Sequence, residues 1–356
     1  MTICYFGNYQ KEYPRNSVLI QGLKQNDVAV LECQTRQTGF KKFISLWWQH
    51  QKIKNKYDVL IVGFAGHALM WFAKLITRKP IVFDAFVSLY LTNVEDRKTC
   101  SSKSLKAKYY AWLDKISCQL ADEILLDTNA QIEYFVDKYG IKKKKFHRIF
   151  VGCDNKIFYS ENSRNKKYPN GEFIVHWHGY IVPFHGFAVI FEAANILWRK
   201  KEPIIFRIIT RFNVASAKYL AAVEDSRLKN IIFRQEASYR ELAEAINQAD
   251  CCLGIFGSNK KAKLVIANKI VEAAACAKPI ITIARDVLEE LFVFNKSIVV
   301  VSTDSGEDLA KKILQFRDDI RWRQEIADNA YQIYTKNLTP KILGKRLKDI
   351  LGILAF

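Results

Sequence analysis

Short apolar runs alternate with longer segments in which apolar residues recur at helical spacing, from residue 2 to about residue 301. Strands buried on both faces of a parallel sheet read as continuous apolar runs, and the helices that connect them read as amphipathic segments. The alternation therefore predicts successive βαβ units. A polar stretch at residues 155–171, rich in Asn, Ser and Lys, predicts a linker that divides the units into two series.

The first series contains six expected strands with helical patterns between them. The strands are expected at residues 2–6, 28–32, 59–62, 81–84, 123–126 and 148–151. The helices are expected at residues 15–24, 40–51, 67–76, 104–120 and 130–139.

The second series repeats this arrangement. Its strands are expected at residues 173–177, 204–209, 231–233, 251–255, 279–283 and 298–301, and its helices include residues 187–199, 239–248 and 265–276. Residues 307–354 are almost wholly helical in pattern and too long for one closing helix. We expect the last segment, residues 340–354, to cross back onto the first domain.

These patterns predict the α/β fold class, with two doubly wound Rossmann-like domains that face one another across a cleft. The expected first domain comprises residues 1–160 together with a C-terminal helix at about residues 340–356, and the second comprises residues 172–339. In open parallel sheets ligands bind outside the carboxyl ends of the strands. Residues directly after each strand are therefore the first candidates for a site.

In the first domain, Gly7 follows the first strand and leads to Arg15 and Asn16 at a helix start. A glycine permits close approach of a ligand, and a helix N-terminus with an arginine suits an anion. An ordinary tight turn explains the glycine equally well.

Three further candidates of the first domain follow later strands. His67 starts a helix after two glycines, so its imidazole can donate to a hydroxyl or a phosphate, although a structural role is as common for such a histidine. Asp84 ends an apolar strand and is the best candidate to orient or deprotonate an acceptor hydroxyl, with helix capping as the alternative. Tyr90 follows it in the same connection.

In the second domain, two loops have the chemistry of a phosphate and ribose site. Gly179 and Gly186 bracket a loop whose amides, backed by a helix dipole, can reach a diphosphate. Residues 254–263 form a basic loop, and Glu272 lies on the helix that follows. A carboxylate among apolar neighbours needs hydrogen-bond partners, and the two hydroxyls of a ribose are a bidentate match.

We expect neither a metal site nor a required cofactor. His176, His178 and His185 resemble a metal cluster, but no fourth ligand is evident, and the eight cysteines show no CxxC spacing.

The segment at residues 268–281 resembles the helix-to-strand signature of glycosyltransferase family 4. The positions that match the signature include Asn268, Lys269, Glu272 and Lys278-Pro279. The resemblance extends over nearly the whole chain. It implies the GT-B fold and a retaining transferase that uses a nucleoside-diphosphate sugar.

By this resemblance Glu272 holds the donor ribose, with Asn268 and Lys269 beside it, and Gly7 and Gly179 line the donor site. The diphosphate is expected to face Lys261 or Lys263, with Arg211 adding positive charge. Arg15, Asn16 and Tyr90 are expected on the acceptor side of the cleft, with Asp84 and His67 as candidate catalytic residues.

The chain also departs from the family pattern at several positions. Leu264 stands where the family commonly has a glutamate, and Tyr180 and His185 replace an arginine and a lysine. Phe86 occupies the position of the usual cleft histidine.

Charge is distributed unevenly along the chain. Residues 1–172 contain 28 Lys and Arg against 16 Asp and Glu, which is +12 of the net charge of +19. An enzyme of small metabolites does not require this charge, so we expect an anionic partner. A membrane surface with anionic lipids fits, and no nucleic-acid-binding motif is present, so no nucleic-acid partner is expected.

The combined prediction is a hexosyltransferase that acts in cell-surface polysaccharide or lipopolysaccharide synthesis on a saccharide or lipid-linked acceptor. Without a secretion signal or a membrane-spanning run, we expect it in the cytoplasm, peripherally bound to the inner face of the plasma membrane. The alternatives are a nucleotide-sugar 2-epimerase or a phosphorylase of the same fold, or a catalytically silent protein that binds nucleotide sugars or nucleic acid.

Overall fold

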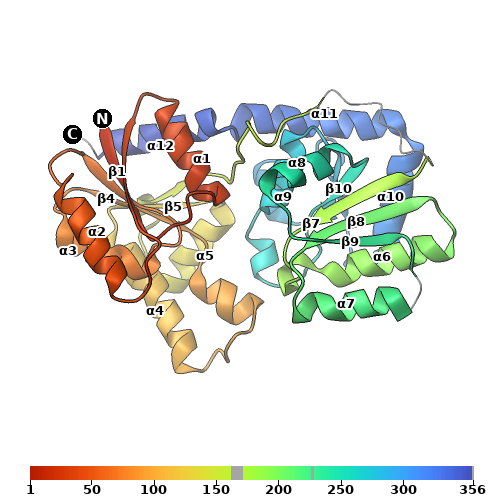
Figure 1. Cartoon of the computed structure of the whole chain (residues 1–356), viewed down its shortest axis with the longest axis horizontal. Helices are drawn as coiled ribbons and strands as arrows, with labels where there is room; N and C mark the ends of the chain where they lie inside the picture. The colour runs from red at the N-terminus through yellow and green to blue at the C-terminus, as the bar shows by residue number, and fades with distance from the viewer. Residues whose placement is uncertain (162–170, 226–227, 355–356) are drawn as a thin grey trace. The chain divides into compact units, whose positions relative to one another are not determined.

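Residues 1–161, 171–225 and 228–354 are described by the structure, a computed structural model, and the chain divides into two units (Figure 1). The first unit comprises Met1–Asp154 and Asn337–Phe356, and the second comprises Asn155–Lys336. Most of the expected linker, residues 162–170, lies outside the described residues.

The first unit is built on one parallel sheet with the strand order β2-β1-β3-β4-β5-β6. Its strands are β1 (Thr2–Gly7), β2 (Ala29–Gln34), β3 (Val59–Val62), β4 (Ile81–Phe86), β5 (Glu123–Leu126) and β6 (Phe146–Arg148). Its α-helices are α1 (Pro14–Lys24), α2 (Lys41–Gln51), α3 (Met70–Ile76), α4 (Leu105–Leu120), α5 (Asn129–Tyr139) and α12 (Pro340–Gly352). Shorter helical turns are η1 (His67–Leu69), the π-helical η2 (Leu91–Asp96) and η3 (Lys143–Lys145).

The second unit also has one parallel sheet, with the order β12-β11-β10-β7-β8-β9. Its strands are β7 (Phe173–His178), β8 (Ile204–Thr210), β9 (Ile231–Gln235), β10 (Cys251–Leu253), β11 (Ile280–Ile283) and β12 (Val299–Val301). Its α-helices are α6 (Phe187–Arg199), α7 (Val214–Asp225), α8 (Tyr239–Asn247), α9 (Asn268–Ala275), α10 (Gly306–Asp318) and α11 (Ile320–Asn337). Shorter turns are η4 (Pro183–His185), η5 (Lys261–Lys263) and η6 (Asp286–Glu290).

Both sheets confirm the predicted α/β class with two Rossmann-like domains. The central strands are apolar because helices cover both faces, and every residue of β3, β4 and β11 is buried. In the first unit, α1 and α12 lie on one face of the sheet and α2 to α5 on the other (Figure 1). Right-handed crossovers place the helices in this way when the strand order reverses once.

Three expected boundaries differ from the structure in ways that matter for the site. β4 continues to Phe86 instead of ending at Asp84, so the carboxylate lies inside the strand. β6 ends at Arg148, where the strand was expected to begin. α9 begins at Asn268, and the preceding residues 265–267 are buried without being helical, because an apolar run by itself does not distinguish helix from extended chain.

The final helix α12 packs against α1 of the first unit, as the sequence predicted. The two helices meet through glycines: a Cβ added at Gly344 would lie 2.0 Å from the carbonyl carbon of Gly22, and one added at Gly22 would lie 2.1 Å from the oxygen of Pro340. Contact at this distance is possible only when both positions lack a side chain. Lys348 adds a hydrogen bond from Nζ to the Asn26 oxygen at 2.7 Å.

Among the described residues, no helix is both long enough and apolar enough to cross a bilayer.

We expect Gly344→Ala to destabilise the first unit by about 1–3 kcal/mol, because the added methyl group forces α12 away from α1. Helix propensity alone predicts the opposite sign, since alanine favours a helix by about 1 kcal/mol over glycine. Urea unfolding measures the difference. The control is Gly352→Ala in the same helix, where a Cβ would meet nothing within 4 Å. An unchanged or raised stability of Gly344→Ala would contradict this account of the helix contact.

Candidate functional site

The second sheet reverses its strand order beside β7, which places a crevice at the carboxyl ends of β7 and β10. The chain runs from β7 outward to β8 and β9 and then returns to the other side of β7 with β10, β11 and β12. Connections that leave a sheet in opposite directions create a binding crevice at this point. Gly179 follows β7, the basic loop follows β10, and α9 comes next along the chain (Figure 1).

Glu272 projects from α9 into this region and is buried, with its side chain 4% exposed. Its Oε2 atom lies 2.8 Å from Nε2 of His178, at the end of β7. Among the described residues, Oε1 of Glu272 has no hydrogen-bond partner. This oxygen is also not completely shielded from solvent. Half of the carboxylate therefore retains its capacity to accept hydrogen bonds.

A second histidine stands behind His178. Nε2 of His176 lies 3.0 Å from Nδ1 of His178, because alternation along β7 places residues 176 and 178 on one face. Burial lowers the pKa of His176 well below its ordinary value, and the nearby His178, Arg207 and Lys269 lower it further, so its ring is neutral. With the Glu272 carboxylate accepting from Nε2 of His178, the remaining nitrogen of His178 accepts from Nε2 of His176.

The histidines therefore form a chain of hydrogen bonds that orients Glu272. Sequence reasoning considered them only as metal ligands, and their i, i+2 spacing on a strand that ends at a glycine was the available signal. Among the described residues no group of three or more His, Cys, Asp or Glu side chains is arranged to hold a metal ion.

Lys269 lies one helical turn before Glu272 and is also buried, at 5% exposure. Its Nζ atom has no hydrogen-bond partner in the described part of the chain and lies 4.1 Å from the centre of the Trp177 ring. Burial lowers the pKa of Lys269 well below its ordinary value, and Glu272 opposes that change. An amine that is buried without a hydrogen bond is costly unless a ligand compensates it.

Gly179 leaves the approach to Lys269 open. Its φ of 128° suits glycine, and a Cβ at this position would lie 3.2 Å from Nζ of Lys269 and 3.2 Å from Cε1 of His185. Burial, followed by the positive charge of Lys269, lowers the pKa of His185 well below its usual range. Any side chain at position 179 would cover the amine.

The two loops of the crevice touch through their backbones. A Cβ at Gly186 would lie 2.3 Å from the amide nitrogen of Gly257, and the Phe256 amide donates to the His185 oxygen at 3.0 Å. This contact holds the basic loop against the loop after β7.

The expected basic residues differ in their surroundings. Lys261 is buried, with Nζ 4.6 Å from the centre of the Phe184 ring, whereas Lys263 is exposed. Arg211, directly after β8, is exposed as well, and Asn268 is half-buried at the first turn of α9. The structure therefore brings Gly179, Lys261, Asn268, Lys269 and Glu272 to adjoining loops and helices of one unit.

In the first unit, Asp84 does not emerge from its strand. It is fully buried and pairs with Arg15, whose Nη2 lies 2.8 Å from Oδ1 and whose Nε lies 3.0 Å from both carboxylate oxygens. Burial raises the pKa of Asp84, and the Arg15 guanidinium counters part of the rise. Nη1 of Arg15 also donates to the backbone oxygens of Ile149 and Phe150 at 2.5 and 3.1 Å. Arg15 and Asp84 thus join α1, β4 and the segment after β6.

Asn16, expected near an acceptor, is likewise engaged inside the unit. It accepts a hydrogen bond from the Tyr5 hydroxyl at 3.1 Å and donates to the Phe64 oxygen at 2.7 Å. The pairing of Asp84 with Arg15 has a physical reason: strand β4 is longer than expected, so its acid faces the interior and requires a buried partner.

His67 is buried at the start of η1, with Nε2 3.5 Å from Oδ1 of Asp114. Burial lowers its pKa, and Asp114 opposes the change. Asp114 also accepts hydrogen bonds from the Ser88 hydroxyl at 2.6 Å and from the Tyr90 amide at 3.1 Å. Tyr90 itself is half-buried, with Nζ of Lys138 3.3 Å from its ring centre.

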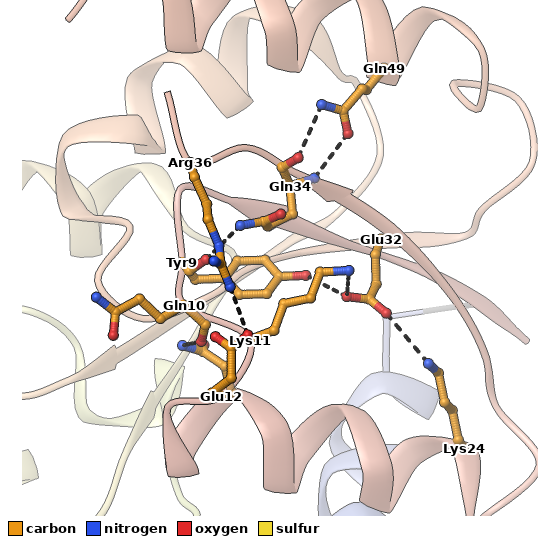
Figure 2. A network of polar contacts seen from close by, with 10 residues as sticks. Tyr9, Gln10, Lys11, Glu12, Lys24, Glu32, Gln34, Arg36 and Gln49 are labelled. Carbon is orange, nitrogen blue, oxygen red and sulfur yellow. Dashed lines mark hydrogen bonds and ion pairs between the residues drawn. The ribbon is translucent and has the colours of Figure 1, made fainter. Parts of the chain in front are cut away.

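The loop after Gly7 is anchored to β2 by a polar network (Figure 2). Glu32 accepts a hydrogen bond from the Tyr9 hydroxyl at 3.2 Å and lies 3.0 Å from Nζ of Lys11. Nε2 of Gln34 donates to the backbone carbonyl oxygen of Tyr9 at 2.8 Å. Partial burial raises the pKa of Glu32, but its lysine neighbours prevail and lower it. The network holds Gly7, with a φ of 149°, at the carboxyl end of β1.

Part of the chain, from within the second unit into the final helix, matches a known protein family. Residues 197–350 match the family described as Glycosyl transferase-like. No curated protein sequence matches the chain.

Several solved structures share the fold of the whole chain. Sucrose-phosphate synthase from Thermosynechococcus elongatus aligns with a TM-score of 0.77 at 13% identity, covering 99% of each chain. Anabaena HepE in complex with UDP and glucose aligns with a TM-score of 0.73 at 14% identity, over 99% of this chain and 100% of HepE. A glycosyltransferase from Rickettsia africae aligns with a TM-score of 0.71 at 13% identity, over 99% of this chain and 98% of its own. These similarities confirm the GT-B fold, and with the family match they confirm the predicted resemblance.

We expect Asp84→Asn to lower the free energy of unfolding by about 3–5 kcal/mol, because it leaves the Arg15 guanidinium buried without a counter-charge. Chemical denaturation measures this loss. Glu12→Gln is the control, because it breaks the exposed ion pair with Arg36, which solvent screens. If Asp84→Asn keeps full stability and loses only activity, the carboxylate is catalytic instead of structural.

Proposed function

We propose that this chain, which has the GT-B fold and matches the Glycosyl transferase-like family over residues 197–350, is a retaining glycosyltransferase that moves a hexose from a nucleoside-diphosphate sugar to an acceptor hydroxyl. The transfer breaks the bond between the anomeric carbon and the diphosphate oxygen. The acceptor oxygen forms the new bond and releases its proton.

The observation that carries this proposal is the pair of incompletely satisfied buried groups on α9. Oε1 of Glu272 can accept hydrogen bonds, and Nζ of Lys269 has no hydrogen-bond partner among the described residues. A nucleoside diphosphate has the complementary chemistry, because ribose hydroxyls donate and phosphate oxygens accept. The two groups lie one helical turn apart, at the strand ends where doubly wound sheets bind ligands.

Charge stabilisation supplies the chemistry in this proposal. Lys269 meets the diphosphate beside Gly179, with Lys261, Lys263 and Arg211 adding positive charge and Asn268 a polar contact. A buried amine without a hydrogen-bond partner stabilises the departing diphosphate more strongly than an exposed one. His178 and His176 keep Glu272 in one orientation, which positions the nucleoside.

The proposed acceptor site belongs to the first unit, near the loops that follow β1, β3 and β4. His67 and Tyr90 are its candidate residues, and Arg15, Asn16 and Asp84 support these loops from the interior. The excess positive charge of residues 1–172 favours an acceptor at an anionic surface, such as a lipid-linked saccharide on the inner face of the plasma membrane. We therefore propose a role in cell-surface polysaccharide or lipopolysaccharide synthesis.

A thermal-shift screen of UDP-, GDP- and ADP-sugars tests the donor class. HepE has been crystallised with UDP-glucose, so UDP-glucose is the first donor to test. A sugar product that appears without any acceptor and differs only at C2 would favour the 2-epimerase. A donor-induced shift without turnover on any acceptor would favour a silent binding protein.

Glu272→Ala is expected to abolish the donor-induced thermal shift, because the ribose hydroxyls lose their acceptor. Loss of such a charged hydrogen-bond partner corresponds to a weakening of binding by roughly tenfold or more. Circular dichroism establishes that the variant is folded. Glu289→Ala, on a short turn of the same unit, is the control. An undiminished shift would refute the ribose assignment.

Lys269→Met is expected to raise the stability of the ligand-free protein and to reduce the donor-induced shift. The lowered pKa of Lys269 means that the unfolded chain binds this proton more tightly than the folded protein does. The resulting loss of stability builds up as the pH falls from the ordinary lysine pKa to the folded-state pKa and is constant below it. Removing an unpartnered buried amine recovers about 1–3 kcal/mol. The melting temperature with and without UDP-glucose measures both effects. The control is Lys200→Met, which changes an exposed lysine at the end of α6 in the same unit. A lower melting temperature without ligand would contradict the account of Lys269.

A further inference from the structure

Three helices of the first unit expose large apolar side chains on one face of the sheet. On α2 and just before it, Phe40, Ile44, Trp47 and Trp48 are 41–74% exposed, and their i, i+4, i+7 spacing places them on one side of the helix. We call the outward sides of α2, α3 and α4 the tryptophan face.

The face continues over α3 and α4. Trp71 and Leu75 of α3 are 51% and 74% exposed, and the Trp71 ring lies 5.3 Å from Phe43 of α2. α4 packs on α3 and exposes Leu105 and Trp112 at 83% and 56%. The three helices lie on the same side of the sheet, opposite α1 and α12 (Figure 1).

Tryptophan is concentrated on this face. Of the seven tryptophans in the chain, Trp47, Trp48, Trp71 and Trp112 are the ones exposed as large hydrophobic side chains in the described residues. Scattered exposed apolar residues are common on any protein, but a contiguous group on adjoining helices indicates an interaction surface.

Positive charge predominates on the tryptophan face. Lys41, Lys74, Lys106 and Lys108 are exposed on the same three helices. Asp114 is the only acidic residue in α2, α3 and α4, and it is fully buried. Asp122, two residues after α4, lies 3.9 Å from Nζ of Lys74 and offsets that lysine. The other three lysines keep the surface of these helices positive, which favours a partner that is anionic as well as apolar.

We propose that the tryptophan face docks this protein onto an anionic lipid bilayer. Tryptophan and tyrosine favour the boundary between headgroups and hydrocarbon, and each nearby basic residue adds about 1 kcal/mol of attraction to anionic lipid. Apolar burial and charge together give reversible binding in the plane of the membrane. The inference rests on the proposed function in one respect, the purpose of membrane docking, which is to bring the enzyme to a lipid-linked acceptor.

Two other occupants fit less well. A second copy of the chain would set one lysine-rich face against another, and like charges repel. Single-stranded nucleic acid stacks on aromatic rings but gains little from aliphatic side chains such as Ile44, Leu75 and Leu105, which an apolar phase accommodates.

Flotation with phosphatidylcholine vesicles, with and without phosphatidylglycerol, tests the proposal on the full-length protein. We expect binding to the anionic vesicles, and Trp48→Ala/Trp71→Ala/Trp112→Ala should weaken it by about tenfold or more. Lys41→Glu/Lys106→Glu/Lys108→Glu should abolish the preference for anionic lipid. The matched control is Val214→Ser/Val293→Ser/Ile320→Ser, which removes exposed apolar side chains from the second unit and should bind like wild type.

Several results would overturn the proposal. Equal binding of wild type to both vesicle types would show that attraction to anionic lipid does not drive docking. Unchanged binding of the tryptophan variant would show that the tryptophan face is not the docking surface. RNA binding or dimerisation that the tryptophan variant abolishes, in a protein that does not float, identifies a different occupant. The UDP-glucose thermal shift is measured on every variant, because loss of lipid binding with an intact shift leaves the donor site unaffected. A wild-type protein that floats but shows no shift contradicts the proposed function alone.

Discussion

Glu272 is held inside the second unit by a hydrogen bond from His178 at 2.8 Å, and the geometry of the candidate site follows from this contact. The bond fixes one carboxylate oxygen and leaves the other able to accept. It also sets the direction of the hydrogen bonds through His178 to His176, because a carboxylate can only accept. The neighbouring Lys269 has no such partner, so α9 presents an acceptor and a cation one helical turn apart.

Buried charge has different consequences in the two units. In the first, Arg15 and Asp84 satisfy one another and join a helix to the sheet, so their burial gives structure. In the second, Lys269 is buried without a hydrogen bond in the described residues, and burial lowers its pKa and opposes folding. A site that is costly without its ligand is typical of proteins that exchange stability for binding.

Glycines determine how closely backbone segments approach around these groups. Gly179 uncovers Lys269, and Gly186 and Gly257 bring the two loops of the crevice into backbone contact. In the first unit, Gly22 and Gly344 perform the same function between α1 and α12. The helices opposite α12 present the tryptophan face, so within the first unit one side of the sheet is closed by α1 and α12 and the other carries the exposed aromatic groups.

The sequence alone determined the fold class, most strand positions and the importance of α9, because buried parallel strands and their connecting helices leave distinct hydrophobic periods, and the motif around Glu272 is local. The uneven distribution of positive charge along the chain was also evident from the sequence. Only the tertiary structure decided that Asp84 is paired with Arg15, that His178 and His176 support Glu272, and that four tryptophans on three helices share one face. These facts depend on contacts between residues up to about a hundred positions apart and on the length of β4, and periodicity does not specify which distant side chains meet.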